Sequence, residues 1–219
     1  MFDPVKFDIA VAERNEKWIK TDDILYRICR EMPRHNDLGE VTAKLTIIGR
    51  SYSTGIERAI RSKHTQGSSV ECLANYIWSN AGEVDKQLSR TCSFDCSHAE
   101  HFREAVDVHG RLVKMLNSIC TRSPRSFVSK YMHFHCPFVP IYDSYAQSGL
   151  SQAIRWRQTL EGAFESPKSA DGPYYRFCIR FWTLYREAIQ VRPHALVKEL
   201  DRYLCYLAKD KVKAAPLVK

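Results

Sequence analysis

The chain has 219 residues, of which 44% are hydrophobic and 26% charged, a composition typical of a globular domain. No apolar run approaches the about 20 residues that span a bilayer, and the N-terminal segment lacks the apolar centre of a secretory signal. We therefore expect a cytoplasmic protein whose eight scattered cysteines are reduced thiols. The net charge of +8 favours an anionic partner such as nucleic acid.

Helical periodicity dominates the sequence, and alternating apolar runs joined by hairpin turns are missing, so we predict an all-α fold. In chain order, the predicted helices lie at about 22–31, 68–78, 99–119, 124–135, 143–150, 174–190 and 196–207. Ser68 and Glu71 form a capping-box pattern at the start of the second of these helices. We predict a single domain over residues 1–219, with two helical lobes and a cleft between them.

The stretch 41–63 has a helical apolar stripe that Gly49 and Gly55 interrupt. Two glycines beside Arg50, Tyr52 and Arg58 predict a break in the helix or the close approach of another backbone. These three polar residues are candidates for contact with substrate or DNA. The alternative is a kinked core helix with a solvated basic face.

The stretch "SFVSKYMHFHCPFVPIYDSYA" places a single carboxylate, Asp143, after an apolar helix and two prolines. Pro124 suits the start of that helix, and Pro137 and Pro140 end it in an extended turn. Asp143 then opens the next helical segment, where it would act first of all as an N-cap.

The segments "SFVSKYMHFH…PIYDS" and "IIGRSYSTGIER" together resemble the helix-hairpin-helix DNA glycosylase superfamily, in a divergent bacterial branch. The resemblance covers about residues 35–150 and implies a hairpin–helix–loop–Asp element at 121–146. It also implies that Asp143 is the catalytic carboxylate, which stabilises positive charge on the sugar or activates water as the base departs.

Two positions depart from the pattern of that superfamily. Its hairpin usually contains glycines, but "TRSPRSF" contains none, so Arg122 and Arg125 would contact phosphate instead. Members that form a Schiff base carry a lysine at the place that falls here on Arg125 or Ser126. We therefore expect a monofunctional enzyme in which water is the nucleophile. Lys130, one helical turn later, would contact DNA or act as a counter-charge to Asp143, and the alternative is a solvated surface lysine.

Other polar residues fit this interpretation less directly. Cys92, Cys96, His98 and His101 are residue types that bind zinc, but their spacing is unusual, and we expect a loop there rather than a metal site. We expect no cofactor.

His133 and His135 stand two residues apart on a helix and so face in different directions, which places one in the core and leaves the other to line a groove. His133 and Tyr142 are further candidates for contact with DNA.

Taken together, these features predict a DNA glycosylase that excises a flipped, modified base from double-stranded DNA and acts as a monomer. A modified cytosine of phage DNA would suit the polar candidates Arg50, Tyr52 and Arg58, and the enzyme would then serve in antiviral defence. The alternative is a non-catalytic helix-hairpin-helix module that binds DNA through phosphates, with Asp143 only a cap. A protein-interaction domain that binds no nucleic acid is a third class.

Overall fold

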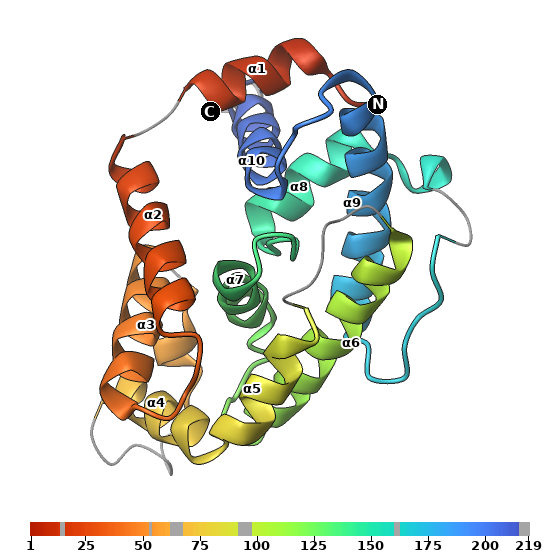
Figure 1. Cartoon of the computed structure of the whole chain (residues 1–219). Coiled ribbons are helices and arrows are strands. Elements are labelled where there is room, and N and C mark those ends of the chain that lie inside the picture. The colour runs from red at the N-terminus through yellow and green to blue at the C-terminus, as the bar shows by residue number, and fades with distance from the viewer. Residues whose placement is uncertain (14–15, 53, 62–67, 92–97, 160–162, 215–219) are drawn as a thin grey trace, which may run out of the picture.

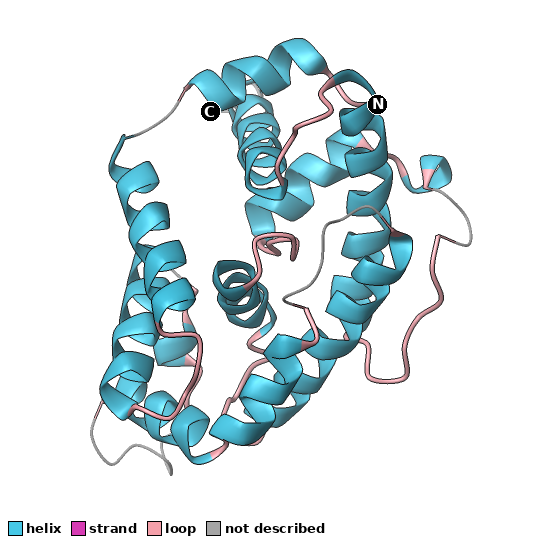
Figure 2. Ribbon diagram, viewed as in Figure 1, coloured by secondary structure: helices cyan, strands magenta, loops and turns pink. Residues whose placement is uncertain are grey.

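The computed structural model describes residues 1–13, 16–52, 54–61, 68–91, 98–159 and 163–214. Within these ranges all the regular structure is helical, which confirms the all-α prediction (Figure 2). The helices are α1 (Pro4–Ala12), α2 (Glu16–Glu31), α3 (Leu38–Ser51), η1 (Ile56–Arg58), α4 (Ser69–Ser79), α5 (Ala81–Ser89), α6 (Ala99–Leu116), α7 (Arg125–His135), α8 (Ser144–Ala153), η3 (Trp156–Gln158), α9 (Gly172–Val191) and α10 (Val197–Ala214). None of the described helices combines the length and the apolar character that a membrane crossing requires.

Local sequence signals account for most helix boundaries. The Ser68–Glu71 capping box is formed at the start of α4, as predicted. The break predicted in 41–63 is present: α3 ends at Ser51, and Gly55, whose φ of 67° lies in the left-handed region that favours glycine, precedes η1. Gly49, by contrast, lies inside α3. Helix α2 starts earlier than the expected residue 22, and α1 and α5 were not predicted.

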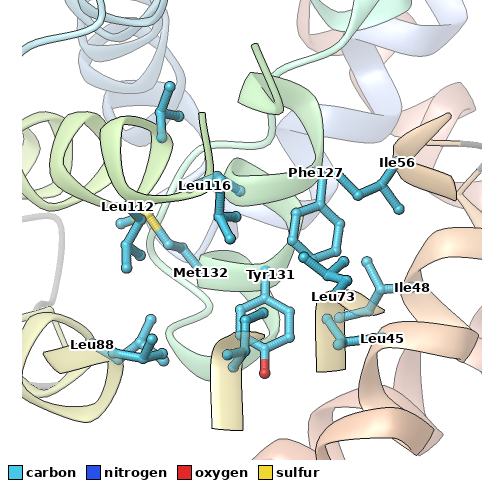
Figure 3. Close-up of a cluster of buried hydrophobic side chains, with 14 of the residues drawn as sticks. Leu45, Ile48, Ile56, Leu73, Leu88, Leu112, Leu116, Phe127, Tyr131 and Met132 are labelled. Carbon is cyan, nitrogen blue, oxygen red and sulfur yellow. The ribbon is translucent and has the colours of Figure 1, made fainter. Parts of the chain in front are cut away.

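The buried hydrophobic side chains form two clusters. The first joins α2–α5 to α7 and to one face of α6, and Figure 3 shows Phe127, Tyr131 and Met132 of α7 at its centre. The second joins α1, α8, α9 and α10 to the beginning of α6. In Figure 1 the two groups of helices occupy different sides of the molecule, and α7 is seen nearly end-on close to the middle.

Helices α8 and α10 approach each other unusually closely. A Cβ atom on Gly149 of α8 would lie 2.0 Å from the carbonyl oxygen of Leu204 in α10, so only glycine fits this contact. Helix α1 packs on α10 as well, with an ion pair of 3.5 Å between Lys6 and Asp210. The last helix is therefore fixed against the helix that follows Asp143.

Candidate active site

Asp143 lies at the N-terminus of α8 beside a buried lysine. Its Oδ1 accepts a hydrogen bond from the backbone N–H of Ala146 (2.9 Å), as expected of an N-cap. Its Oδ2 lies 3.0 Å from Nζ of Lys130, which also donates to Oγ of Ser126 (3.2 Å). The Lys130 side chain is 4% exposed and that of Asp143 is 23% exposed. The three residues predicted to be catalytic thus lie together, and the alternative of a surface lysine is wrong.

The loop between α7 and α8 is fixed by side chains from two helices. Oγ of Ser129 on α7 accepts from the backbone N–H of Tyr142 (3.0 Å). The hydroxyl of Tyr174 on α9 donates to the carbonyl of Pro140 (2.9 Å). These hydrogen bonds bring the chain back along α7, so that Asp143 lies beside Lys130 although the loop contains no regular structure.

A second set of charged residues adjoins this pair. The ring of Tyr52 lies 5.7 Å from Nζ of Lys130 and 5.0 Å from Nζ of Lys198, and its hydroxyl donates to Asp22. Lys198 Nζ lies 3.6 Å from Asp22 and 3.4 Å from Asp201. Tyr52 was predicted as a site residue, whereas Asp22, Lys198 and Asp201 were missed. These five residues come from α2, the C-cap of α3, α7 and α10, and we call them together with Asp143 the ionic cluster.

Burial controls the electrostatics of the ionic cluster. Burial raises the pKa of both Asp22 and Asp201, and the neighbouring cation Lys198 offsets this only in part. Burial also acts to lower the pKa of Lys198, but Asp201 and Asp22 outweigh it, and the pKa lies above its ordinary value. The free energy needed to remove ions from water commonly exceeds the free energy gained from their mutual attraction. Such a cluster is therefore more typical of a functional site than of residues that only stabilise the fold.

A groove of about 1570 Å³ lies next to the ionic cluster. It is bounded by α2, α5, the segment 134–138 and the beginning of α10. Asp22 and Lys198 form part of its wall, together with the rings of Tyr26 and Phe134. The cluster therefore connects the pair of Asp143 and Lys130 with a cavity large enough for a ligand.

The two histidines at the end of α7 have different environments. His133 is fully buried; its Nδ1 lies 2.8 Å from the carbonyl oxygen of Val139 and its Nε2 lies 2.5 Å from the hydroxyl of Tyr26. Burial lowers the pKa of His133 to about 3. Because the His133 side chain is fully buried, the prediction that it contacts DNA is wrong. His135 lines the groove, so one histidine is in the core and the other is at a cavity, as expected.

Three of the predicted DNA-contacting arginines, Arg50, Arg58 and Arg122, are exposed. An isolated antiparallel bridge between Ile60 and Cys120 brings the segment after η1 alongside the turn between α6 and α7. Arg58 and Arg122 therefore belong to adjacent segments, although they are far apart in the sequence.

Arg125, the other arginine of the proposed hairpin, already has a partner. Its guanidinium makes two hydrogen bonds to the carboxylate of Asp171, one of 2.7 Å, and lies 5.7 Å from the ring centre of Tyr142. A phosphate would have to compete with Asp171 for it. The roles of Arg125 and Tyr142 in DNA binding, and the helix-hairpin-helix assignment itself, stay predictions.

The zinc alternative falls partly outside the described residues, because these omit Cys92 and Cys96. His98 is the N-cap of α6 and His101 lies in its first turn, with ring centres 5.6 Å apart. Among the described residues no group of three or more side chains is placed to bind a metal ion.

Asp143, Lys130 and Ser126 thus form a compact polar site; none of the three lines the large groove, which the ionic cluster reaches through Asp22 and Lys198. Comparison with known proteins assigns the chain to no family, since no family model, no curated protein and no solved structure matches it.

Proposed function

We propose that the protein is a monofunctional DNA glycosylase and that Asp143 is its catalytic carboxylate. The observation that carries this proposal is the contact of 3.0 Å between a partly exposed Asp143 and a buried Lys130 at the N-terminus of a helix. Departure of a base leaves positive charge on the sugar, and a carboxylate held at that point stabilises the charge or activates the attacking water.

The groove supports a modified base as the substrate. A base must leave the duplex before its glycosidic bond can be reached, and it then needs a pocket that offsets the cost of unstacking. Ligand pockets commonly measure about 300–1,000 Å³, so a groove of about 1570 Å³ has room for a base with a bulky substituent. Tyr26, which is partly exposed in the groove, offers its ring against such a ligand. A modified cytosine of phage DNA belongs to this class, and its removal would make the protein a defence enzyme.

The environment of Lys130 supports water rather than lysine as the nucleophile. In this arrangement Nζ is an ammonium group that donates to Asp143 and Ser126, and an ammonium nitrogen has no lone pair with which to attack a sugar. The exposed arginines Arg50, Arg58 and Arg122 are the proposed phosphate contacts, because each combines exposure with a fixed charge.

The test compares two N-cap aspartates. Asp143→Asn keeps the shape and the capping acceptor but removes the charge, and so does Asp37→Asn at the start of α3, which serves as the control. Against duplexes that carry a panel of modified bases, we expect Asp143→Asn to lose excision by about 10²–10⁴-fold with DNA affinity retained, and Asp37→Asn to behave as wild type.

Two outcomes refute the proposal. If Asp143→Asn excises as fast as wild type, Asp143 is only a cap. If wild type binds duplexes but releases none of the bases in the panel, the protein is the non-catalytic DNA-binding module that the sequence also allows.

A further inference from the structure

Asp201 of α10 carries a buried oxygen without a hydrogen bond. The residue is 7% exposed, and its Oδ2 lies 3.4 Å from Nζ of Lys198. Its Oδ1 has no hydrogen-bond partner among the described residues. A buried carboxylate oxygen without a donor is costly, and such an oxygen in a native protein calls for a functional explanation.

Asp201 lies on α10, the helix that packs against α8, whose N-cap is Asp143. The titratable and charged groups that interact with it are Lys198 and Cys205 on its own helix, Lys130 on α7, Asp143 on α8 and Tyr26 on α2. The contact of Gly149 with the Leu204 backbone, one turn further along α10, fixes this helix against α8. Asp201 therefore lies in a rigid position within the electrostatic field of Lys130 and Asp143.

In the free protein, Asp143 lacks the unpaired negative charge that the proposed reaction needs. Both oxygens of Asp143 are engaged, Oδ1 by the backbone of Ala146 and Oδ2 by Lys130. An ammonium group at 3.0 Å largely cancels the charge that the sugar cation would need. A second acceptor for Lys130 would release that charge without exposing the lysine.

We propose that Asp201 is a positioning residue that provides this second acceptor. When substrate reaches Asp143, Lys130 moves its hydrogen bond from Oδ2 of Asp143 to the vacant Oδ1 of Asp201, and Asp143 then faces the sugar with its charge unpaired. The proton stays on Lys130 throughout, and no bond other than hydrogen bonds changes. Lys198 holds the other oxygen of Asp201, and the ring of Tyr52, close to both ammonium groups, borders the path of Lys130.

This inference rests on the proposed function, and a double-mutant cycle tests it. Asp201→Asn removes the charge of the second acceptor, and Lys130→Met removes the group that would use it. We expect Asp201→Asn to lower single-turnover excision about tenfold without changing DNA affinity, and to have no further effect in the Lys130→Met background. Asp201→Glu should restore part of the rate. Asp210→Asn, on the same helix but paired with Lys6, is the control and should excise as wild type.

A purely structural role for Asp201 would act with or without Lys130, so additive losses in the cycle overturn the proposal. If Asp201→Asn does not fold, Asp201→Ala replaces it in the same cycle.

A measurement that does not need activity separates this inference from the glycosylase assignment. In the free protein, loss of the Asp143 charge in Asp143→Asn should shift the carboxyl titration of Asp201, followed by NMR, to lower pH, because Asp143 is one of the groups that raise the pKa of Asp201. An unchanged Asp201 titration overturns the coupling even if excision is confirmed. A shifted titration supports the coupling even if the wild type excises no base, and that outcome refutes the glycosylase assignment alone.

Discussion

Replacement of Gly149 by alanine should separate the two helices that hold the site. The new Cβ atom would lie 2.0 Å from the Leu204 carbonyl oxygen and 2.8 Å from its Cα, whereas ordinary contacts begin at 3.4 Å. Backbone atoms cannot turn aside as a flexible side chain does. Helix α8 must therefore move by about 1.4 Å from α10, and overpacking of this kind costs about 1–3 kcal/mol.

The assay combines unfolding with excision. For a chain of this length, about 1–3 kcal/mol corresponds to a fall in Tm of about 2–12 °C. Gly82→Ala in α5 is the matched control, since a Cβ atom there meets nothing within 4 Å, and we expect it to be neutral or stabilising by up to about 1 kcal/mol. Because α8 begins at Asp143, Gly149→Ala should also lower excision at temperatures where the protein is still folded.

A Gly149→Ala protein with the Tm of wild type would refute the close contact of α8 with α10. A protein that is destabilised but excises at the wild-type rate would show that the distance between these helices does not control Asp143.

Three further predictions concern pH, salt and covalent trapping. Burial lowers the pKa of His109 to about 4 and of His133 to about 3, below the ordinary value of 6.5, so the unfolded chain takes up protons first as the solution is acidified. The free energy of unfolding present above pH 6.5 should thus fall as the pH decreases toward 4, by about 2 kcal/mol per histidine at pH 5. His109→Gln should therefore flatten the dependence of Tm on pH. Arg122→Ala should weaken binding of cognate and ordinary duplexes equally and reduce the slope of log affinity against log salt by about one, while an unchanged slope would remove this turn from the DNA interface. Borohydride should trap no covalent DNA complex; trapping that disappears in Lys130→Ala would show that this lysine, and not water, attacks the sugar.

The all-α fold and the position of Asp143 at the start of a helix could be predicted because their sequence signals are local. The Ser68 capping box, the break at Gly55 and the N-cap Asp143 each depend on a few consecutive residues. The position of Lys130 could not be predicted by counting back from Asp143. The loop between α7 and α8 returns along α7, and it does so through a hydrogen bond between Ser129 and Tyr142 that the sequence pattern does not reveal.

The missed residues of the ionic cluster come from helices at opposite ends of the chain. Asp22 meets Lys198 only because α2 and α10 pack around the same groove, whereas Asp201 lies one helical turn from Lys198 on α10. One signal was available: Asp201 lies between Leu200 and Leu204, on the apolar face of its helix, where a charged residue is unusual. An isolated carboxylate on such a face identifies a buried site, but not its partners.

The division of the ionic cluster between distant helices has a consequence for the order of folding. The hydrophobic cluster around α7 uses only residues 25–139, and its contacts are available to the chain before α10 takes part. Lys198 and Asp201 lie on α10, whose apolar side chains belong to the other cluster, and Lys198 joins Asp22 across most of the sequence; contacts of such separation form slowly. During refolding, burial of the α7 core should therefore precede assembly of the ionic cluster. Local opening of α10 should take the ionic cluster apart while that core stays intact, which makes docking of the last helix the step that completes the cluster.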